Sequence, residues 1–549
     1  MSPLADLRRG GYGSPMLRLM SLVIIVASAL VIWSAPGAHA AKIPQGTLIH
    51  VADGAVQGTT NGQVRQFLGI PFAAPPVDAL RWRPPAPAIP WPGVLQADAF
   101  GAACPQLASL QGPASNTEDC LFLNVFTPDP ASSKPRPVMV WFHGGSNQVG
   151  SAGNLVPVPG IPGHFYDAQV LSKERDVVVV TVNYRLNLFG FFAHAALAGE
   201  NSARPYAGNQ GLLDQQAALR WVQTNIRMFG GNPNRVTIFG ESAGSEDVCL
   251  QMVSPGTRNL FHRAISESGG CTTHLPTRTA GAANATALAT AVGCAGRADE
   301  LACLRQVSVD TLLSNVASGD FNPVVDGGVL PDQPRTLFDT NQVADVPYLL
   351  GSNTDEGTLF FIGVPPVTSA AEYQAALQTR YGTLASQVEA VYPAANFASP
   401  QAALMRAFGD EILVCPTYDT ARRAAAAGRH TYLYNFSRVP PIAILQALGL
   451  GAFHGAEIAY VFGSVTPPTP EDAALAHMIR GYWSRFARHG RPNGPGAVGW
   501  PRYRDRTDQR LNLDVQPVVL TGFRRLECAF WFGVYDRSFT GSPSGAFVD

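Results

Sequence analysis

The sequence predicts an α/β protein in which helices cover a mostly parallel central sheet. Short apolar runs recur along the chain, and strands are expected at residues 138–142, 177–183, 236–239, 264–266, 346–350 and 430–436. Helical patterns, such as the one at 212–229, lie between these runs. This alternation is typical of parallel sheets, because a chain needs a helix-length crossover to reach a parallel neighbour.

The length of the chain would allow three domains of about 150 residues each. No linker, internal repeat or low-complexity tract divides it, so we expect residues 41–549 to form a single domain. The alanine-rich segment 368–448 is expected to supply helical insertions that roof a pocket, rather than a cofactor-binding element. The Pro- and Gly-rich piece 156–163 is either a rim loop or a surface insertion.

A strand, a sharp turn and a helix are predicted around Ser242. Residues 235–239 are strand-like, residues 240–244 are Gly-Glu-Ser-Ala-Gly, and residues 245–253 can be helical. So tight a turn leaves no room for a Cβ two positions before and after the serine, where Gly240 and Gly244 stand, and its strained backbone exposes the hydroxyl at the sheet edge. This pattern is the nucleophile elbow of serine hydrolases, although a Gly-rich loop can match it by chance.

A serine nucleophile requires a histidine base and a carboxylate that orients the base. After an elbow of this kind the acid comes next in the chain and the histidine last. Asp355 and Glu356 lie in a polar turn after an apolar strand, and His454 lies in a Gly-flanked loop. The pattern alone leaves other histidines open, namely His262, His274, His430, His477 and His489.

Further motifs lie in separate parts of the chain. They are residues 69–76 (Gly-Ile-Pro-Phe-Ala-Ala-Pro-Pro), 80–82 (Leu-Arg-Trp), 118–125 (Glu-Asp-Cys-Leu-Phe-Leu-Asn-Val), 141–145 (Trp-Phe-His-Gly-Gly) and 183–186 (Asn-Tyr-Arg-Leu). With the elbow, they resemble the type-B carboxylesterases, the cholinesterase-like family of α/β hydrolases, over nearly all of the chain after residue 40. The resemblance implies the α/β-hydrolase fold, Glu356 as the acid and His454 as the base, with Asp355 as the rival acid.

Acyl transfer also requires hydrogen-bond donors aimed at the oxygen that becomes negative. The N–H of Ala243 is expected to be one, at the start of a helix whose dipole favours negative charge. The resemblance implies the N–H groups of Gly145 and Ser146 as the others. The family usually has a third glycine where Ser146 stands, but a backbone donor survives if the serine adopts the required φ and ψ. A plain turn after a strand is the alternative.

Four residues are candidates for the pocket. By resemblance Glu241 is a buried carboxylate lining the gorge, not a catalytic group; a solvated turn residue is the alternative. Asn147 stands where the family commonly has an aromatic residue. This implies that the part of the pocket that receives the acyl group is more polar or roomier than usual. Cholinesterases bind the quaternary ammonium through a tryptophan between the first two cysteines. Here the loop 105–119 has no aromatic residue, and Leu359 replaces a choline-pocket aromatic, with Phe360 after it.

Acetylcholine is therefore expected to be a poor substrate. The short loop between the first two cysteines also favours a soluble ester of modest size over an emulsified triglyceride. The expected reaction is ester hydrolysis through an acyl-enzyme on Ser242, with a small-molecule ester as the partner. It requires no metal or cofactor, and His454 with Glu457 is interpreted as a loop histidine before a helix rather than a metal pair.

Two other classes of function stay open. One is a catalytically inactive, adhesion-type member of the same fold. The other is a lipase, thioesterase or amidase that uses the same triad. The net charge of −1 gives no electrostatic argument for nucleic acid or an anionic membrane as a partner.

Residues 1–40 have the pattern of a signal peptide. Three arginines precede an apolar run at 19–33, and Ala38-His39-Ala40 is an A-x-A cleavage pattern. The run is shorter than the roughly 20 residues of a comfortable membrane span, so no stable membrane anchor is expected, an uncleaved anchor being the alternative. We expect cleavage after Ala40 and a secreted or periplasmic, bacterial protein.

Eight cysteines follow residue 40, as an oxidising compartment permits. Their pairing cannot be deduced from the sequence alone. The family resemblance implies the pairs Cys104–Cys120, Cys294–Cys303 and Cys415–Cys528. Cys249 and Cys271 are left as a fourth disulfide or as two buried thiols.

Overall fold

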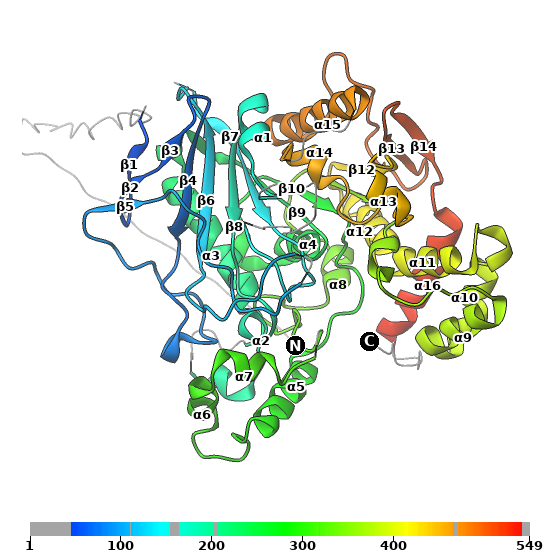
Figure 1. Cartoon of the computed structure of the whole chain (residues 1–549), viewed down its shortest axis with the longest axis horizontal. Helices are drawn as coiled ribbons and strands as arrows, with labels where there is room; N and C mark the ends of the chain where they lie inside the picture. The colour runs from blue at the N-terminus through cyan, green and yellow to red at the C-terminus, as the bar shows by residue number, and fades with distance from the viewer. Residues whose placement is uncertain are drawn as a thin grey trace, which may run out of the picture. The chain divides into compact units, whose positions relative to one another are not determined.

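Eleven strands form the central sheet, in the order β14-β13-β12-β11-β10-β9-β7-β8-β6-β4-β3. The computed structural model describes residues 46–109, 111–132, 134–153, 164–200, 207–317, 319–464 and 469–540. Neighbouring strands pair in parallel through the middle of the sheet, in the order β13-β12-β11-β10-β9-β7-β8. Antiparallel strands complete both ends of the sheet. The α/β-hydrolase fold with a mostly parallel sheet is thereby confirmed (Figure 1).

The six expected strands correspond to β7 to β12, with ends that differ by a few residues. The antiparallel end strands and a small second sheet, β1-β2-β5, were not predicted. The strand bounds are β1 (Leu48–Val51), β2 (Gly54–Gln57), β3 (Thr59–Thr60), β4 (Val64–Pro71), β5 (Val94–Gln96), β6 (Phe122–Pro128), β7 (Arg136–Phe142), β8 (Val178–Val182), β9 (Gly231–Glu241), β10 (Arg263–Glu267), β11 (Tyr348–Asn353), β12 (Thr431–Phe436), β13 (Gln509–Leu513) and β14 (Val518–Thr521).

Both faces of the central strands are buried, which explains their uninterrupted apolar sequences. In β7, Val138, Val140 and Phe142 belong to one hydrophobic core. Met139 and Trp141, which point to the other face, belong to a second core. A strand between two cores has no solvent-facing side, so it shows no alternation of polar and apolar residues.

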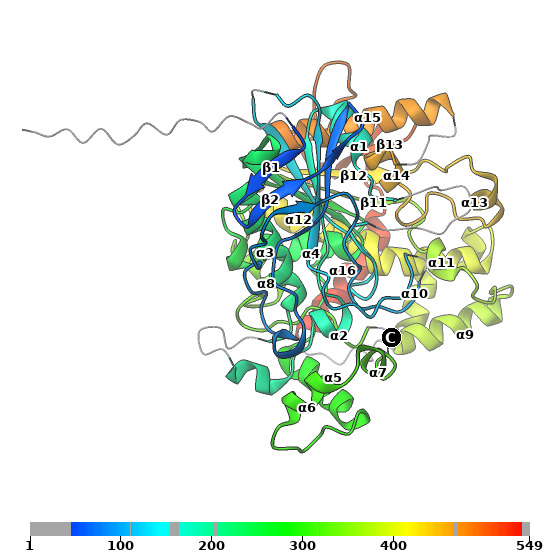
Figure 2. The same ribbon diagram turned by 60° about the vertical axis from the view of Figure 1, so that its left-hand side comes forward.

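Helices on the two faces close these two cores. On one face, α4 (Ala243–Val253) packs against β7, β9 and β10, and α12 (Cys415–Ala426) packs against β11 and β12. On the other face, α15 (Pro470–His489) packs against β7 and β9 and shares its core with α14 (Ile458–Phe462). The sheet is thus covered by helices on both sides, as Figure 2 also shows.

The alanine-rich segment 368–448 is helical as expected, apart from β12. Figure 1 and Figure 2 show α9, α10 and α11 grouped beside the sheet. The remaining helix bounds are α1 (Gln169–Arg175), α2 (Asn187–Gly190), α3 (Gln210–Asn225), α5 (Arg278–Ala291), α6 (Glu300–Gln306), α7 (Val309–Leu313), α8 (Pro334–Asp339), α9 (Ala370–Tyr381), α10 (Ala385–Val391), α11 (Pro400–Gly409), α13 (Ala443–Ala447) and α16 (Arg525–Thr540).

Residues Ile43–Asp549 form one compact unit. The expected signal peptide, 1–40, and the expected rim loop, 156–163, lie outside the described residues. Within the described ranges, no helix is both long and apolar enough to cross a membrane.

Four disulfides link the chain. Three are the pairs implied by the family resemblance: Cys104–Cys120, Cys294–Cys303 and Cys415–Cys528. The fourth, Cys249–Cys271, joins α4 to the segment after β10, so these two cysteines are not buried thiols. Cys415 starts α12 and Cys528 lies in α16, so their disulfide fixes the last helix to the helical layer of the sheet.

Replacing Cys415 and Cys528 by alanine should lower the free energy of unfolding by about 4 kcal/mol, because that disulfide closes a long loop in the unfolded chain. Its sequence separation is 113, against 9 for Cys294–Cys303. The matched Cys294→Ala, Cys303→Ala variant should therefore lose less, by about 2 kcal/mol. Urea titrations measure both, and equal losses would contradict the loop-length explanation.

Candidate active site

The backbone at Ser242 forms the sharp turn that the elbow motif predicts. Ser242 lies between the end of β9 and the start of α4, with φ 57° and ψ −126°. A Cβ on Gly240 would lie 2.4 Å from the carbonyl oxygen of Gly244, and a Cβ on Gly244 would lie 2.1 Å from that of Phe142. Both positions therefore require glycine. The Ser242 N–H donates to the Glu267 carbonyl, 2.9 Å away, which holds the turn against β10.

His454 and Glu356 form a buried hydrogen-bonded pair. His454 Nδ1 lies 2.7 Å from Glu356 Oε2. Glu356 follows β11, and its second oxygen, Oε1, accepts the backbone N–H of Asn353 at 2.6 Å. The residue is 1% exposed. The carboxylate is therefore fixed in orientation and shielded from water, which are the conditions for holding an imidazole in one tautomer.

Asp355, the rival acid, has different partners. Its carboxylate accepts the backbone N–H of Ala452 at 2.9 Å and pairs with Arg406 at 3.1 Å. A backbone bridge also joins Asp355 to Phe453. Asp355 thus ties the turn that carries Glu356 to the loop that carries His454.

Glu241 is buried beside the other nitrogen of the imidazole. Its carboxylate oxygen Oε1 lies 3.2 Å from His454 Nε2. Burial raises the pKa of Glu241 to about 8. The residue is therefore a buried carboxylate at the candidate site rather than a solvated turn residue.

Two further buried carboxylates, Glu457 and Glu267, were not identified from the sequence as site residues. Glu457 accepts hydrogen bonds from Asn353 Nδ2 at 2.5 Å and from Ser268 Oγ at 3.2 Å. Glu267 accepts one from the indole N–H of Trp483 at 2.8 Å. Burial raises the pKa of both, that of Glu457 to about 7. One of the two could have been found from the sequence. Glu267 ends β10, the strand beside β9, and the ends of neighbouring parallel strands meet at the same sheet edge as Ser242.

The carboxylates of Glu241 and Glu356 change the pKa of His454. Burial by itself lowers the pKa of His454, but the negative charges of Glu241 and Glu356 outweigh it and raise the pKa to about 9. An imidazole in this setting gains stability when it takes up a proton.

The glycine loop after β7 lies directly against the nucleophile turn. A Cβ on Gly144 would lie 2.9 Å from Ser242 Cβ. Gly145 has φ 112° and Ser146 has φ 56°. The serine thus adopts the left-handed backbone that a third glycine would favour, and the hydrogen bonds among the described residues leave the N–H groups of Gly145 and Ser146 unused. Ala243 opens α4 on the other side of Ser242.

The other pocket candidates lie in two places. Asn147 is 1% exposed, and its amide donates to the buried carboxylate of Asp247 at 3.3 Å. Leu359 and Phe360 follow the acid turn, and Leu359 is partly buried. The Phe360 ring centroid lies 5.3 Å from that of His454. Phe360 is thus in contact with the predicted base, whereas the Asn147 side chain is bonded to Asp247.

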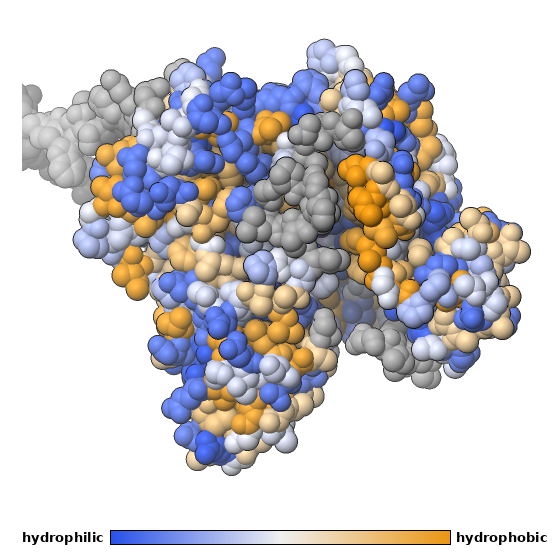
Figure 3. Space-filling model, viewed as in Figure 1, coloured by the Kyte–Doolittle hydropathy of each residue, from blue (hydrophilic) through white to orange (hydrophobic). Residues whose placement is uncertain are grey.

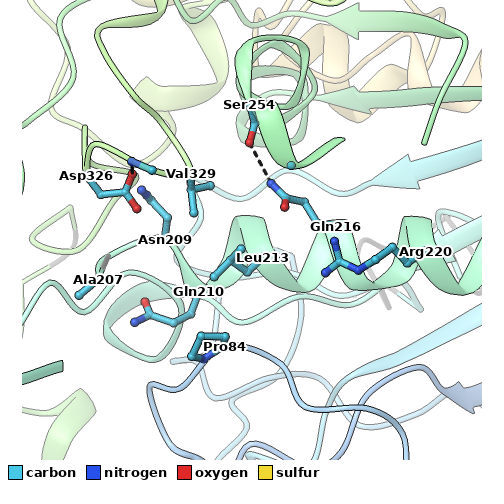
Figure 4. Close-up of a pocket in the computed structure, with 12 residues that line it drawn as sticks. Pro84, Ala207, Asn209, Gln210, Leu213, Gln216, Arg220, Ser254, Asp326 and Val329 are labelled. Atoms are coloured by element: carbon cyan, nitrogen blue, oxygen red, sulfur yellow. Dashed lines mark hydrogen bonds between the residues drawn. The ribbon is translucent and has the colours of Figure 1, made fainter. Parts of the chain in front are cut away.

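A separate cavity of about 220 Å³ lies away from these residues (Figure 4). Its lining includes Gln216 and Asp326. Gln216 Nε2 donates to Ser254 Oγ at 3.0 Å, and Asp326 Oδ1 accepts the N–H of Leu330 at 2.9 Å. Among the described residues Asp326 Oδ2 has no hydrogen-bond partner, and we assign the cavity no role.

The sheet topology and the serine at its elbow define the class of α/β hydrolases. A model of the carboxylesterase family matches residues 45–531. The chain is 37% identical to the fumonisin B1 esterase of Sphingopyxis macrogoltabida, over 83% of this chain and 84% of that protein. It is 34% identical to carboxylesterase 1D of Rattus norvegicus, over 96% and 99%, and 35% identical to the acylcarnitine hydrolase of Mus musculus, over 90% of each. The chain belongs to the carboxylesterase family, and the relatives above are carboxylic ester hydrolases by name.

The Glu241→Gln variant should lower the pKa of His454 by about one, because it removes a carboxylate in contact with Nε2. Titration of the histidines, followed by NMR in histidine-labelled protein, measures this change. Glu174→Gln is the matched control, since Glu174 contacts the exposed His477. That control should leave His454 unmoved, and an unmoved His454 in Glu241→Gln would refute the electrostatic assignment.

Proposed function

We propose that this chain is an exported serine esterase that hydrolyses carboxylic esters through an acyl-enzyme on Ser242. The observation that carries the proposal is the buried pair of His454 Nδ1 and Glu356 Oε2, 2.7 Å apart, at the sheet edge where the strained turn holds Ser242. The same three residue types, in the same chain order, perform acyl transfer on this fold. Membership of the carboxylesterase family supports the same chemistry.

In this mechanism His454 Nε2 takes the proton of Ser242 as the hydroxyl attacks the ester carbonyl. Glu356 holds the imidazole through Nδ1 and stabilises the imidazolium that forms. The nearby carboxylate of Glu241 favours the same charge. The alcohol then leaves with a proton from His454, and water hydrolyses the acyl-enzyme by the reverse route.

The negative oxygen of the tetrahedral intermediate would be held by the N–H groups of Gly145, Ser146 and Ala243. Donors of this kind are usually the largest single electrostatic contribution to acyl transfer. The positive φ of Gly145 and Ser146, and the close approach of Gly144 to Ser242, support this role.

The substrate we propose is a soluble ester, with acetylcholine a poor one. The loop between Cys104 and Cys120 lies over the glycine loop, since Gln106 Nε2 donates to the Gly150 carbonyl at 3.1 Å. Its residues 105–119 include no aromatic ring that could face a quaternary ammonium group. One relative is named an acylcarnitine hydrolase, so ester classes beyond simple alkyl esters should be screened.

A series of p-nitrophenyl esters, from acetate to palmitate, tests the activity. The unmodified protein should hydrolyse the short-chain esters, and Ser242→Ala should lower kcat by at least about a thousandfold, because the nucleophile is lost. Glu356→Gln should lower kcat by about ten-thousandfold, because the amide favours the wrong tautomer of His454.

Asp355→Asn is the matched control, since Asp355 neighbours Glu356 but contacts Ala452 and Arg406 instead of His454. It should lower kcat by less than about tenfold. A larger loss in Asp355→Asn than in Glu356→Gln would reverse the assignment of the acid. Folded protein without activity on any ester would favour a catalytically inactive binding protein.

Export rests on the arginines, the apolar run and the Ala38-His39-Ala40 pattern before residue 41. The four disulfides are consistent with an oxidising compartment. When the full-length chain is expressed in a bacterial host, the mature protein should be found in the periplasm or the medium. Its N-terminal sequence should begin at Ala41, because cleavage is expected after Ala40. Recovery of an uncleaved chain in the membrane fraction would contradict the proposal and favour an anchor.

A further inference from the structure

Large apolar side chains are exposed on two loops beside His454. Ile444 and Leu448, in and just after α13, are 54% and 52% exposed, and no residue of α13 is buried. Phe360, Ile362 and Val364, after the acid turn, are also exposed. None of the residues 439–453 carries a charged side chain. In Figure 3 a band of hydrophobic residues lies where Figure 1 labels α13.

Hydrogen bonds hold the two loops together. Thr358 Oγ1 donates to the carbonyl oxygen of Leu450 at 2.7 Å, and the N–H of Ala452 donates to Asp355 at 2.9 Å. We call the exposed side chains of Phe360, Ile362, Val364, Ile444 and Leu448 the apolar rim. Phe360 connects this rim to the candidate site, because its ring packs against both Phe408 and His454.

Exposed apolar side chains that gather beside a candidate site often mark a surface that a ligand covers. The contact of Phe360 with His454 indicates that the substrate itself is the group that covers these side chains. His454 must deliver its proton to the leaving oxygen, so the alcohol half of the ester lies beside the imidazole. The donors for the negative oxygen are expected on the glycine loop and at the start of α4.

We propose that the apolar rim binds an aliphatic chain carried by the alcohol half of the substrate. This inference rests on the proposed ester hydrolysis and assigns its substrate class: soluble esters of long-chain aliphatic alcohols. The bound chain covers Ile444 and Leu448 and passes Phe360 to reach the carbonyl at Ser242. The release of ordered water from both apolar surfaces drives the binding.

Octyl acetate and ethyl octanoate separate the two halves of the ester, because they are isomers with the long chain on opposite sides of the carbonyl. Both are assayed below the concentration at which they aggregate, and the released acid is titrated at constant pH. The double variant Ile444→Ser, Leu448→Ser should lower the ratio of kcat/KM for octyl acetate to that for ethyl octanoate by about tenfold. Both substitutions are on exposed side chains, so the fold should be retained.

Ile89→Ser is the matched control, since Ile89 is 66% exposed and lies near Trp91, whose indole donates to the Ala55 carbonyl of β2. Figure 1 and Figure 2 both show β2 far from α13, with strands of the sheet between them. Ile89→Ser should leave the ratio unchanged.

Three results would overturn the proposal. The ratio could stay unchanged in the double variant while both esters are still hydrolysed. Alternatively, ethyl octanoate could be the isomer that loses turnover, which would place the acyl half on the rim. Finally, size-exclusion chromatography with light scattering could show a dimer that the double variant dissociates, with the ratio unchanged, so that the rim would be a self-association surface. If the proposed ester hydrolysis itself were wrong, the result would differ from all three. The unmodified protein would then cleave neither isomer nor ethyl acetate.

Discussion

The hydrogen bond between His454 and Glu356 is the interaction on which the candidate site depends. It joins two loops that follow different strands, β12 and β11, and it is formed only if both loops return to the same point. Asp355 secures this meeting by binding the backbone of Ala452, next to the loop of His454. The acid turn therefore has two carboxylates with separate tasks: one orients the imidazole, and its neighbour holds the two loops together.

The register of the parallel strands brings the other carboxylates to the same place. Glu241 at the end of β9 lies opposite Glu267 at the end of β10, and Glu267 lies opposite Gly351 in β11. Carboxyl ends of parallel strands meet at one sheet edge, so Glu267 lies beside Glu241, the acid in contact with His454 Nε2. Burial raises the pKa of Glu241 and Glu267, and charge on the carboxylates in contact with His454 raises its pKa in turn. Carboxylates beside His454 would thus stabilise the imidazolium that forms in the proposed mechanism.

Much of the fold and part of the site were predictable because their signals are local. The strands β7 to β12 are apolar runs buried on both faces, and the turn at Ser242 is a contiguous motif whose glycines leave no room for a Cβ against Gly244 and Phe142. The end strands β4, β6, β13 and β14 were not predicted; β4 and β6 pair with each other antiparallel across about fifty residues, and β13 adds in parallel to β12 only after the helix α15. Glu267 was missed because its environment comes from Trp483, a residue far along the chain.

The sequence by itself determined the fold class, the nucleophile turn, the oxyanion-loop candidates and, through family resemblance, three of the four disulfides. Each depends on short-range backbone geometry or on motifs that are contiguous in the chain. The resemblance implied Glu356 as the acid, and the tertiary structure shows that Glu356 rather than Asp355 contacts His454. Only the tertiary structure decided that Glu241 contacts the other nitrogen of His454 and that Cys249 pairs with Cys271. These depend on distances between segments that strand register and helix packing bring together, which no local pattern encodes.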